Sequence, residues 1–373
     1  MVAVKNWVGL SVARDEMRRS VFLANSRSGS LKWTEQSYGP RGRWESEPNA
    51  DQSVSVFSYG LDQSNATKLL VIISGTHGVE GPAGHHVQEL FVRTSHAWLL
   101  PPNTAVALIH GLNPWGWSFE RRVDNQNVDP NRGSFEEAQQ TRGRYERWKH
   151  LASPETLNDD WVSGITTCLN DPDQCRELVA NVICGQFHQP SGMFYGGNGL
   201  CWSARTLQQI CLNEFSRFCR IGVIDVHTGI GPEGKGMIIS PLLERDSPEA
   251  ETVKAWHGKD VQFPNAGKSV LGYSVSGDVL SGMARWLPEC EVVATALEMG
   301  TIPFAKSFPL LIAENWLFHH QCQVGERAVR SALERIGYNR DAFLQSFIPT
   351  DLRWWSTLER SFFSMVGKVL GNI

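Results

Sequence analysis

The chain has 373 residues, of which 41% are hydrophobic and 20% charged. This balance is typical of a compact globular protein and excludes a disordered tail protein or a fibrous repeat. Thirty-five Lys and Arg residues against 39 Asp and Glu leave a formal net charge of -4, so no global field favours nucleic acid or an anionic membrane as a partner. We therefore expect a small-molecule or peptide ligand.

Three features of the sequence bear on where the protein works. The longest apolar runs, such as residues 68–74, fall short of the roughly 18 residues that a membrane span needs. The first 24 residues mix charged and apolar side chains and lack the continuous apolar region of a secretory signal peptide. The eight cysteines lie far apart with no C-x-x-C pair, which favours buried reduced thiols. We expect a soluble cytoplasmic protein, and the oligomeric state stays open.

Short apolar runs rich in Val and Ile alternate along the chain with stretches of helical periodicity, which predicts an α/β layered fold. The expected strands, buried on both faces, are residues 69–73, 105–109, 222–226, 236–239 and 292–297. The expected helices are residues 83–93, 203–217, 310–321 and 326–336.

Two further segments extend this pattern. Residues 135–182 are polar and acidic and are interpreted as a helical insertion. Residues 340–373 carry apolar side chains at roughly helical spacing, which predicts a C-terminal helical extension that packs back on the rest of the chain. We expect a single domain over residues 1–373, with a motif core at 68–302.

Two predicted strands end in residues that bind metals. An H-x-x-E pair, His77 and Glu80, follows the first strand, and His227 follows the strand at 222–226. Ligands gather at the carboxyl ends of strands in open α/β sheets, and two His with one Glu leave a zinc position open to water. These residues predict a catalytic zinc site, and the alternative is a pair of structural histidines.

A third predicted strand is followed directly by Glu298. A carboxylate beside metal-bound water accepts its proton and later passes that proton to a leaving amine, which predicts a general base and acid. The alternative is a carboxylate that caps the following turn or pairs with an arginine.

The segment 113–132 contributes groups that bind anions. Arg132 offers a planar fork to a carboxylate, and Asn131 adds an amide donor. Either Arg121 or Arg122 suits polarisation of a scissile carbonyl. Surface loops also use Asn and Arg freely, so the alternative is an ordinary loop.

In combination and order, these motifs resemble the zinc carboxypeptidase superfamily, which includes succinylglutamate desuccinylase and aspartoacylase, and its subgroup of unknown function. The motifs are H-x-x-E, N-P-x-G with R…D-x-N-R, D-x-H-T-G and L-E-x-G-T, and they span residues 75–301. The resemblance implies a mixed, mostly parallel eight-stranded sheet between helices.

The resemblance also implies roles for individual residues. It assigns one zinc ion per chain to His77, Glu80 and His227, proton transfer to Glu298, carbonyl polarisation to Arg122, and a substrate carboxylate to Asn131 and Arg132. It further implies that Asp129 holds His77 in the correct tautomer. Pro130 and Gly133 depart from the family's usual residues beside this clamp. Tyr273 is a candidate for the substrate-binding tyrosine that carboxypeptidases carry on a loop.

Together, these observations predict a zinc hydrolase that cleaves an amide or peptide bond next to a free carboxylate. The motifs do not separate a carboxypeptidase from an N-acyl amino acid deacylase of the desuccinylase and aspartoacylase type. A non-catalytic carboxylate-binding protein on the same fold is the alternative from another class. Manganese or cobalt also fits nitrogen and oxygen ligands.

Overall fold

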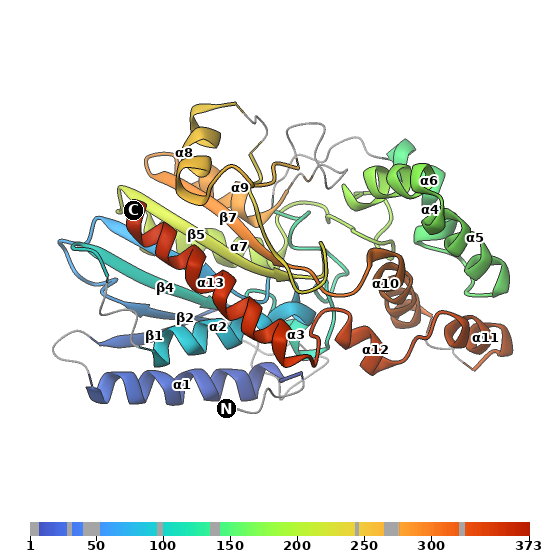
Figure 1. The fold of residues 1–373 in the computed structure, drawn as a ribbon, viewed down its shortest axis with the longest axis horizontal. Helices are drawn as coiled ribbons and strands as arrows, with labels where there is room; N and C mark the ends of the chain where they lie inside the picture. Colours follow the sequence, from blue (N-terminus) through green and yellow to red (C-terminus); the bar gives the residue numbers. More distant parts are fainter. Residues whose placement is uncertain are drawn as a thin grey trace.

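The computed structural model describes residues 7–27, 32–39, 53–94, 100–134, 142–242, 246–264, 275, 277–320 and 325–373. Within these ranges, seven strands form one sheet in the order β1-β2-β4-β3-β5-β7-β6 (Figure 1). They are β1 (Trp33–Tyr38), β2 (Val54–Tyr59), β3 (Lys68–Ile73), β4 (Thr104–His110), β5 (Arg220–Thr228), β6 (Gly236–Ile239) and β7 (Glu291–Met299). The four central strands β4, β3, β5 and β7 run parallel, which confirms the predicted mixed, mostly parallel sheet.

The described sheet has one strand fewer than the family resemblance implies. Beyond β6, Gln262 forms only an isolated parallel bridge with Ile239. Pro264 follows two residues later and has no N–H to donate, so this pairing does not extend into a ladder. Among the described residues, this edge of the sheet therefore carries a single bridge beyond β6.

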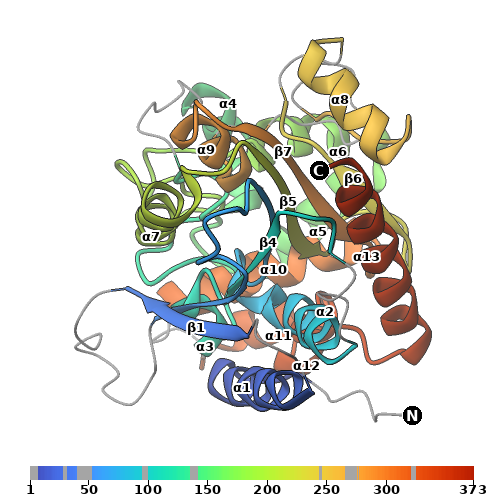
Figure 2. The ribbon, with the colours of Figure 1, turned by 90° about the vertical axis from the view of Figure 1, so that its left-hand side faces the viewer.

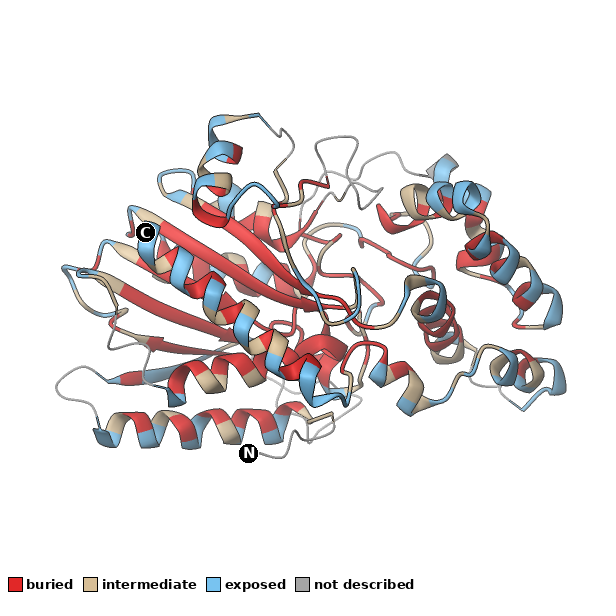
Figure 3. Cartoon of the chain, viewed as in Figure 1, coloured by how far each residue is buried: buried red, intermediate tan, exposed pale blue. Residues whose placement is uncertain are grey.

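The central strands are buried on both faces, as their apolar sequences predict. Leu70 and Ile72 of β3 point into one hydrophobic cluster, whereas Leu69, Val71 and Ile73 point into the other. This alternation follows from the two-residue period of a strand. Figure 3 shows the resulting continuous buried layer along β3, β4, β5 and β7.

Helices cover both faces of this sheet (Figures 1 and 2). One face is covered by α2 (Gly81–Arg93) and α13 (Leu352–Asn372), with α1 (Leu10–Arg27) packed outside α2. The other face is covered by α7 (Trp202–Ile210), which continues as a π-helical turn over Cys211–Phe215, and by α9 (Val279–Trp286). The short helices α3 (Pro114–Ser118) and α8 (Pro248–His257) complete these layers.

A second group of helices lies beyond the carboxyl ends of the parallel strands (Figure 1). It comprises α4 (Arg142–Ala152), α5 (Asp159–Asn170), α6 (Pro172–Leu178) with a π-helical turn at Val179–Ile183, α10 (Phe304–His319), α11 (Arg327–Arg335) and α12 (Arg340–Gln345). The part of the expected insertion that the structure describes is thus helical. The expected C-terminal extension is also present as α12 and α13, and α13 packs against β5, β6 and β7.

Some elements lie outside the sequence predictions. The first strands β1 and β2 and the first helix α1 were not predicted. In the described chain, the seven cysteines are free thiols, and no helix there is long and apolar enough to cross a bilayer.

Candidate active site

The loop after β3 brings the H-x-x-E pair to the edge of the sheet. Gly75 takes φ 69°, a left-handed conformation that favours glycine, and the chain then enters a short 3-10 helix at Gly78–Glu80. A Cβ at Gly78 would lie 1.9 Å from a backbone carbon of Gly116, so only glycine allows α3 to approach this closely. The glycines of the motif therefore position His77 and Glu80 against α3.

The three predicted metal ligands converge in the structure. Their ligand atoms all lie within 4.8 Å of one another, and all three side chains are buried. Nδ1 of His77 lies 2.9 Å from Oε1 of Glu80, and Nδ1 of His227 lies 3.0 Å from Oε2 of the same carboxylate. Burial would raise the pKa of Glu80, but His77 and His227 outweigh it and lower that pKa well below its ordinary value.

The second ring nitrogen of each imidazole, Nε2, contacts a further carboxylate. Nε2 of His77 lies 3.0 Å from Oδ1 of Asp129, the contact that the family resemblance implies. Nε2 of His227 lies 2.6 Å from Oδ2 of Asp225, whose carboxylate accepts a hydrogen bond from the Thr76 hydroxyl. An N–H donated to a carboxylate leaves Nδ1 as the lone-pair nitrogen that a metal needs.

The sequence predictions did not include Asp225. The signal was present, because residues two apart on a strand point to the same face. Asp225 precedes His227 by two residues on β5, so both side chains reach the same side of the sheet edge.

The structure separates the two neighbouring arginines. The side chain of Arg122 reaches the site, where Nε donates to Oδ2 of Asp129 at 3.1 Å and an Nη donates to Oε1 of Glu80 at 3.3 Å. Arg121 points the other way and pairs with Glu314 of α10 at 2.8 Å. Arg122 is thus the arginine beside the ligand group, and Arg121 belongs to the packing of α10.

Asn131 and Arg132, which are predicted to bind a substrate carboxylate, line the same cavity as Arg122. The Arg132 side chain is buried, with Nε and one Nη donating to the carbonyl oxygen of Ile183 and the other Nη donating to that of Asn131. The amide oxygen of Asn131 accepts from the backbone N–H of Val279. These bonds hold the Arg132 fork in one orientation and leave further N–H groups of the guanidinium for a ligand.

Glu298 reaches the site from the neighbouring strand. It stands opposite His227 in the parallel ladder of β5 and β7, and its Oε1 accepts the backbone N–H of Ile230 at 2.9 Å. Burial, helped by the charge of Glu80, raises the pKa of Glu298 to about 8.

These side chains line one cavity of about 450 Å³. The cavity contains the predicted residues His77, Glu80, Arg122, Asn131, Arg132, His227 and Glu298, together with many apolar side chains. Tyr273 lies outside the described residues. The structure therefore brings seven predicted residues to one place, and Asp129 stands directly behind them.

Solved structures with a similar fold include carboxypeptidases. Thrombin-activatable fibrinolysis inhibitor aligns with a TM-score of 0.50 over 99% of this chain and 75% of that chain, at 8% identity. Carboxypeptidase A from Helicoverpa armigera aligns with a TM-score of 0.41 over 87% of this chain and 82% of that chain, at 11% identity. Succinylglutamate desuccinylase from Chromobacterium violaceum aligns with a TM-score of 0.37 over 75% and 65%, at 16% identity. The fold of this chain is carboxypeptidase-like.

The amino-acid sequence identifies the family of this chain. Residues 16–358 match the family described as "protein of unknown function (DUF2817)", and the chain belongs to this family. No match was found among curated proteins. The match confirms the predicted subgroup of unknown function, and the solved structures confirm the predicted likeness of fold to carboxypeptidases.

Proposed function

We propose that this protein is a zinc-dependent hydrolase that cleaves an amide or peptide bond next to a free carboxylate. The observation that carries the proposal is the convergence of His77, Glu80 and His227 in a buried cavity, with each imidazole held by its own carboxylate. A structural pair of histidines needs no third ligand and no open cavity beside it.

The donor set fits a zinc ion. Two imidazole nitrogens and one carboxylate oxygen are ligands that catalytic zinc sites use. Ligands at 2.0–2.1 Å in a tetrahedral site stand about 3.3 Å apart. The Nδ1 atoms of His77 and His227 already lie 2.9 and 3.0 Å from the Glu80 oxygens, so small side-chain shifts admit the ion. When bound, zinc supplies a Lewis acid and lowers the pKa of a coordinated water.

The remaining side chains have separate tasks in this proposal. Glu298, fixed by the Ile230 N–H, accepts the proton of the attacking water and returns it to the leaving nitrogen. Arg122, oriented by Asp129, donates to the carbonyl oxygen as it gains negative charge. Arg132 and Asn131 bind the substrate carboxylate, since their other contacts fix both side chains at the cavity wall.

We further propose that residues 1–373 work as a single domain with a motif core at 68–302, an insertion at 135–182 and the extension at 340–373. The described helices of the insertion support a single domain, because α5 packs against both α10 and α11. The backbone carbonyl of Glu155 also accepts a hydrogen bond from the Trp316 indole of α10. We infer a cytoplasmic location from the sequence features given above.

Metal analysis of the purified chain tests the proposal first. We expect about one zinc per chain, lost in His77→Ala and in His227→Ala. His86→Ala is the matched control, because His86 pairs with Glu359 of α13 and lies outside the ligand group. No bound metal after zinc has been offered would overturn the proposed site.

Turnover is the second part of the test. We expect the zinc-loaded chain to hydrolyse C-terminal peptides or N-acyl amino acids, and Glu298→Gln to abolish this activity while zinc remains bound. Bound zinc without turnover of any amide substrate would instead favour a carboxylate-binding protein. Loss of activity in Glu298→Gln together with loss of zinc would assign Glu298 to the metal site itself.

A further inference from the structure

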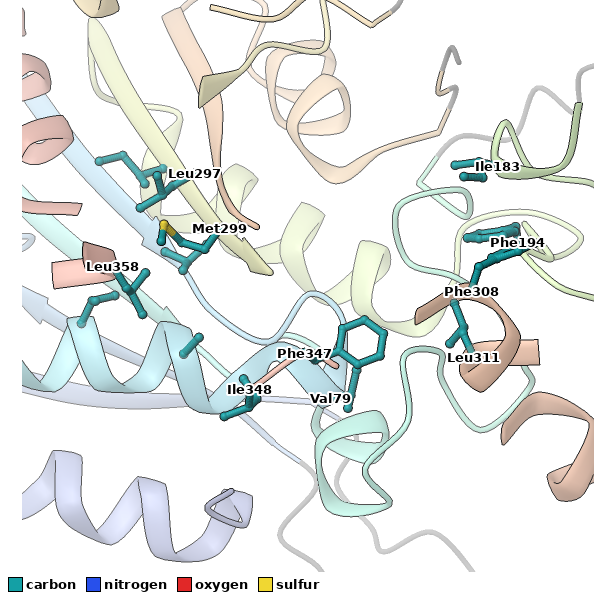
Figure 4. Packing of buried hydrophobic residues seen from close by; sticks show 14 of the residues in the cluster. Val79, Ile183, Phe194, Leu297, Met299, Phe308, Leu311, Phe347, Ile348 and Leu358 are labelled. Atoms are coloured by element: carbon teal, nitrogen blue, oxygen red, sulfur yellow. The ribbon is translucent and has the colours of Figure 1, made fainter. Parts of the chain in front are cut away.

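One side of the active-site cavity is an apolar surface built from three separate segments. We call this surface the apolar wall, and its residues are Val179 and Ile183 of the π-helical turn, Phe194 of the loop between that turn and α7, and Phe304, Phe308 and Leu311 of α10. Figure 4 shows Ile183, Phe194, Phe308 and Leu311 gathered together, apart from Phe347 and Val79. None of the three segments belongs to the metal-binding motifs.

The rings of the apolar wall stack in a row. Phe304 and Phe308 have ring centroids 4.8 Å apart with planes inclined by 22°. Phe194 continues the row, with its centroid 6.4 Å from that of Phe308 and its plane inclined by 13°. Stacked rings present flat apolar surface, which suits an aromatic ring or a broad alkyl group.

Phe194 occupies the position in this row that lies next to the catalytic groups. Its ring centroid lies 5.5 Å from the guanidinium carbon of Arg122 and 5.5 Å from that of Arg132. A ligand held by Arg132 and reacting beside Arg122 therefore meets Phe194.

The backbone of Phe194 is held in a conformation that this residue type seldom adopts. Its φ is 53°, in the left-handed region that favours glycine and asparagine. The Phe194 carbonyl accepts from Gln186 N at 3.1 Å, and the Tyr195 carbonyl accepts from Asp129 N at 2.8 Å. A disfavoured conformation that neighbouring contacts enforce is characteristic of residues placed for function.

The charges of the cavity limit what else the substrate carries. Among the described lining residues, the arginines are Arg122 and Arg132, and there is no lysine. Arg122 already faces the carboxylates of Asp129 and Glu80, and the Asp278 carboxylate also lines the cavity. Arg132 can therefore bind one substrate carboxylate, but a second carboxylate against the apolar wall would lose its hydration without a cationic partner.

We propose that the substrate carries one carboxylate and a bulky apolar group, aromatic or alkyl, and that Phe194 determines this preference. The proposal rests on the proposed function for the identity of the site, and it separates the two substrate types that the motifs leave open. A small acidic N-acyl amino acid, with carboxylates at both ends, is the less favoured ligand. Phe194 is a specificity-determining residue in this scheme.

Equilibrium binding to the zinc-loaded full chain tests the preference without turnover. The probes are 3-phenylpropionate and succinate, which differ only in having a phenyl ring or a second carboxylate at one end. Titration calorimetry is expected to show 3-phenylpropionate binding at least about tenfold more tightly than succinate, because the ring buries apolar area on the wall. Succinate binding as tightly or more tightly would overturn the proposal.

Phe194→Gly removes the ring while accepting the observed φ, so strain does not prevent its folding. It is expected to keep its zinc and to lose most of the tenfold preference. Phe304→Ala shortens the same wall from α10 and is expected to lower the preference in the same direction, whereas Phe22→Ala, at a ring 73% exposed on α1, leaves it unchanged. An unchanged preference in Phe194→Gly would also overturn the proposal. Failure of the proposed function appears separately, as absent hydrolysis by a chain whose binding preference is intact.

Discussion

At the scale of single residues, the geometry of the ligands depends on carboxylates that do not touch the metal position. Asp225 fixes the ring of His227 through a 2.6 Å contact and is itself held by the Thr76 hydroxyl. Partners of this kind orient the imidazole and increase its basicity, and their loss costs 10- to 100-fold in metal affinity in well-studied sites.

We therefore expect Asp225→Asn to weaken zinc binding by about 10- to 100-fold. The amide keeps the shape of the side chain but no longer offers a charged acceptor to Nε2 of His227. Competition with a chromogenic chelator measures the affinity. Asp171→Asn makes the same chemical change at the partly exposed N-cap of α6 and is expected to leave the affinity unchanged. Equal affinities for Asp225→Asn and the unaltered chain would contradict the assigned role.

The adjacent arginines show where sequence information ends at this scale. Their positions in the motif are equivalent by residue type, and only the packing of α10, almost two hundred residues away, directs Arg121 toward Glu314. Strand-end residues such as His227 and Glu298 were predictable because a buried strand followed by a polar residue is a local signal. Phe194 was not assigned, since its ring contacts Arg122, Arg132 and Phe308, which come from distant segments. Asp225 was not assigned either, although its two-residue spacing from His227 on β5 is a local signal.

A stability measurement tests the structural role of Arg121. Arg121→Met leaves the buried Glu314 carboxylate without its cation, so we expect a loss of about 3–5 kcal/mol in the free energy of unfolding. Replacing both members with methionine should restore most of that loss. Urea denaturation of the single and double variants checks this. If Arg121→Met were as stable as the unaltered chain, the pair would have no structural role.

At the scale of elements, burial explains which ones the sequence revealed. The central strands were predicted because both faces are covered and their residues are apolar. Strand β1 reads Trp-Thr-Glu-Gln-Ser-Tyr, only Trp33 of it is buried, and it exists through pairing with β2. Helix α1 buries Arg14 and Ser20 among its apolar residues, which obscures its periodicity. Helix α10 begins at Phe304, six residues before the predicted start at residue 310. The difference arises because Pro309 lies inside the helix, whereas a proline usually marks a helix boundary.

The end of α8 provides a pH-dependent contact between elements. His257 is buried there beside Thr295 of β7, and Lys368 of α13 donates to its carbonyl oxygen. Burial, followed by the charge of Lys368, lowers the pKa of His257 to about 4. Between about pH 6.5 and 4, the unfolded chain binds a proton at this position and the folded chain does not, so stability falls as the pH drops through that window.

His257→Gln should remove this part of the acid sensitivity. Because one pKa unit corresponds to 1.36 kcal/mol, the stability lost between pH 7 and 5 should be about 2 kcal/mol smaller in the variant. Urea denaturation at the two pH values measures the difference. His150→Gln, at an exposed histidine of α4, is the control and should behave as the unaltered chain does. An identical pH dependence in His257→Gln would show that another group carries the effect.

At the scale of the whole molecule, the site joins segments that are far apart in the chain. The ligands come from the loop after β3 and from β5, and Glu298 comes from β7. The apolar wall comes from the π-helical turn at Val179–Ile183, from the loop that carries Phe194, and from α10. The parallel arrangement of β3, β5 and β7 was predictable from the alternation of strands and helices. The approach of the insertion to α10 was not, because hydrogen bonds such as Trp316 Nε1 to the carbonyl of Glu155 link residues with no common sequence pattern.

A metal that joins these segments should stabilise the entire fold. The candidate ligands are adjacent only when β3 and β5 are paired, so we expect zinc to bind the folded chain far better than the unfolded one. A ligand with this preference stabilises by about 4 kcal/mol when its free concentration is 1,000 times its Kd. We expect a chelator to lower the Tm of the zinc-loaded chain, and added zinc to restore it, in scanning calorimetry. His77→Ala should melt at one temperature with or without zinc, whereas Glu298→Gln should keep the full zinc-dependent shift, because Glu298 lies beside the ligand group without belonging to it. A zinc-dependent shift that persists in His77→Ala would place the stabilising ion elsewhere on the molecule.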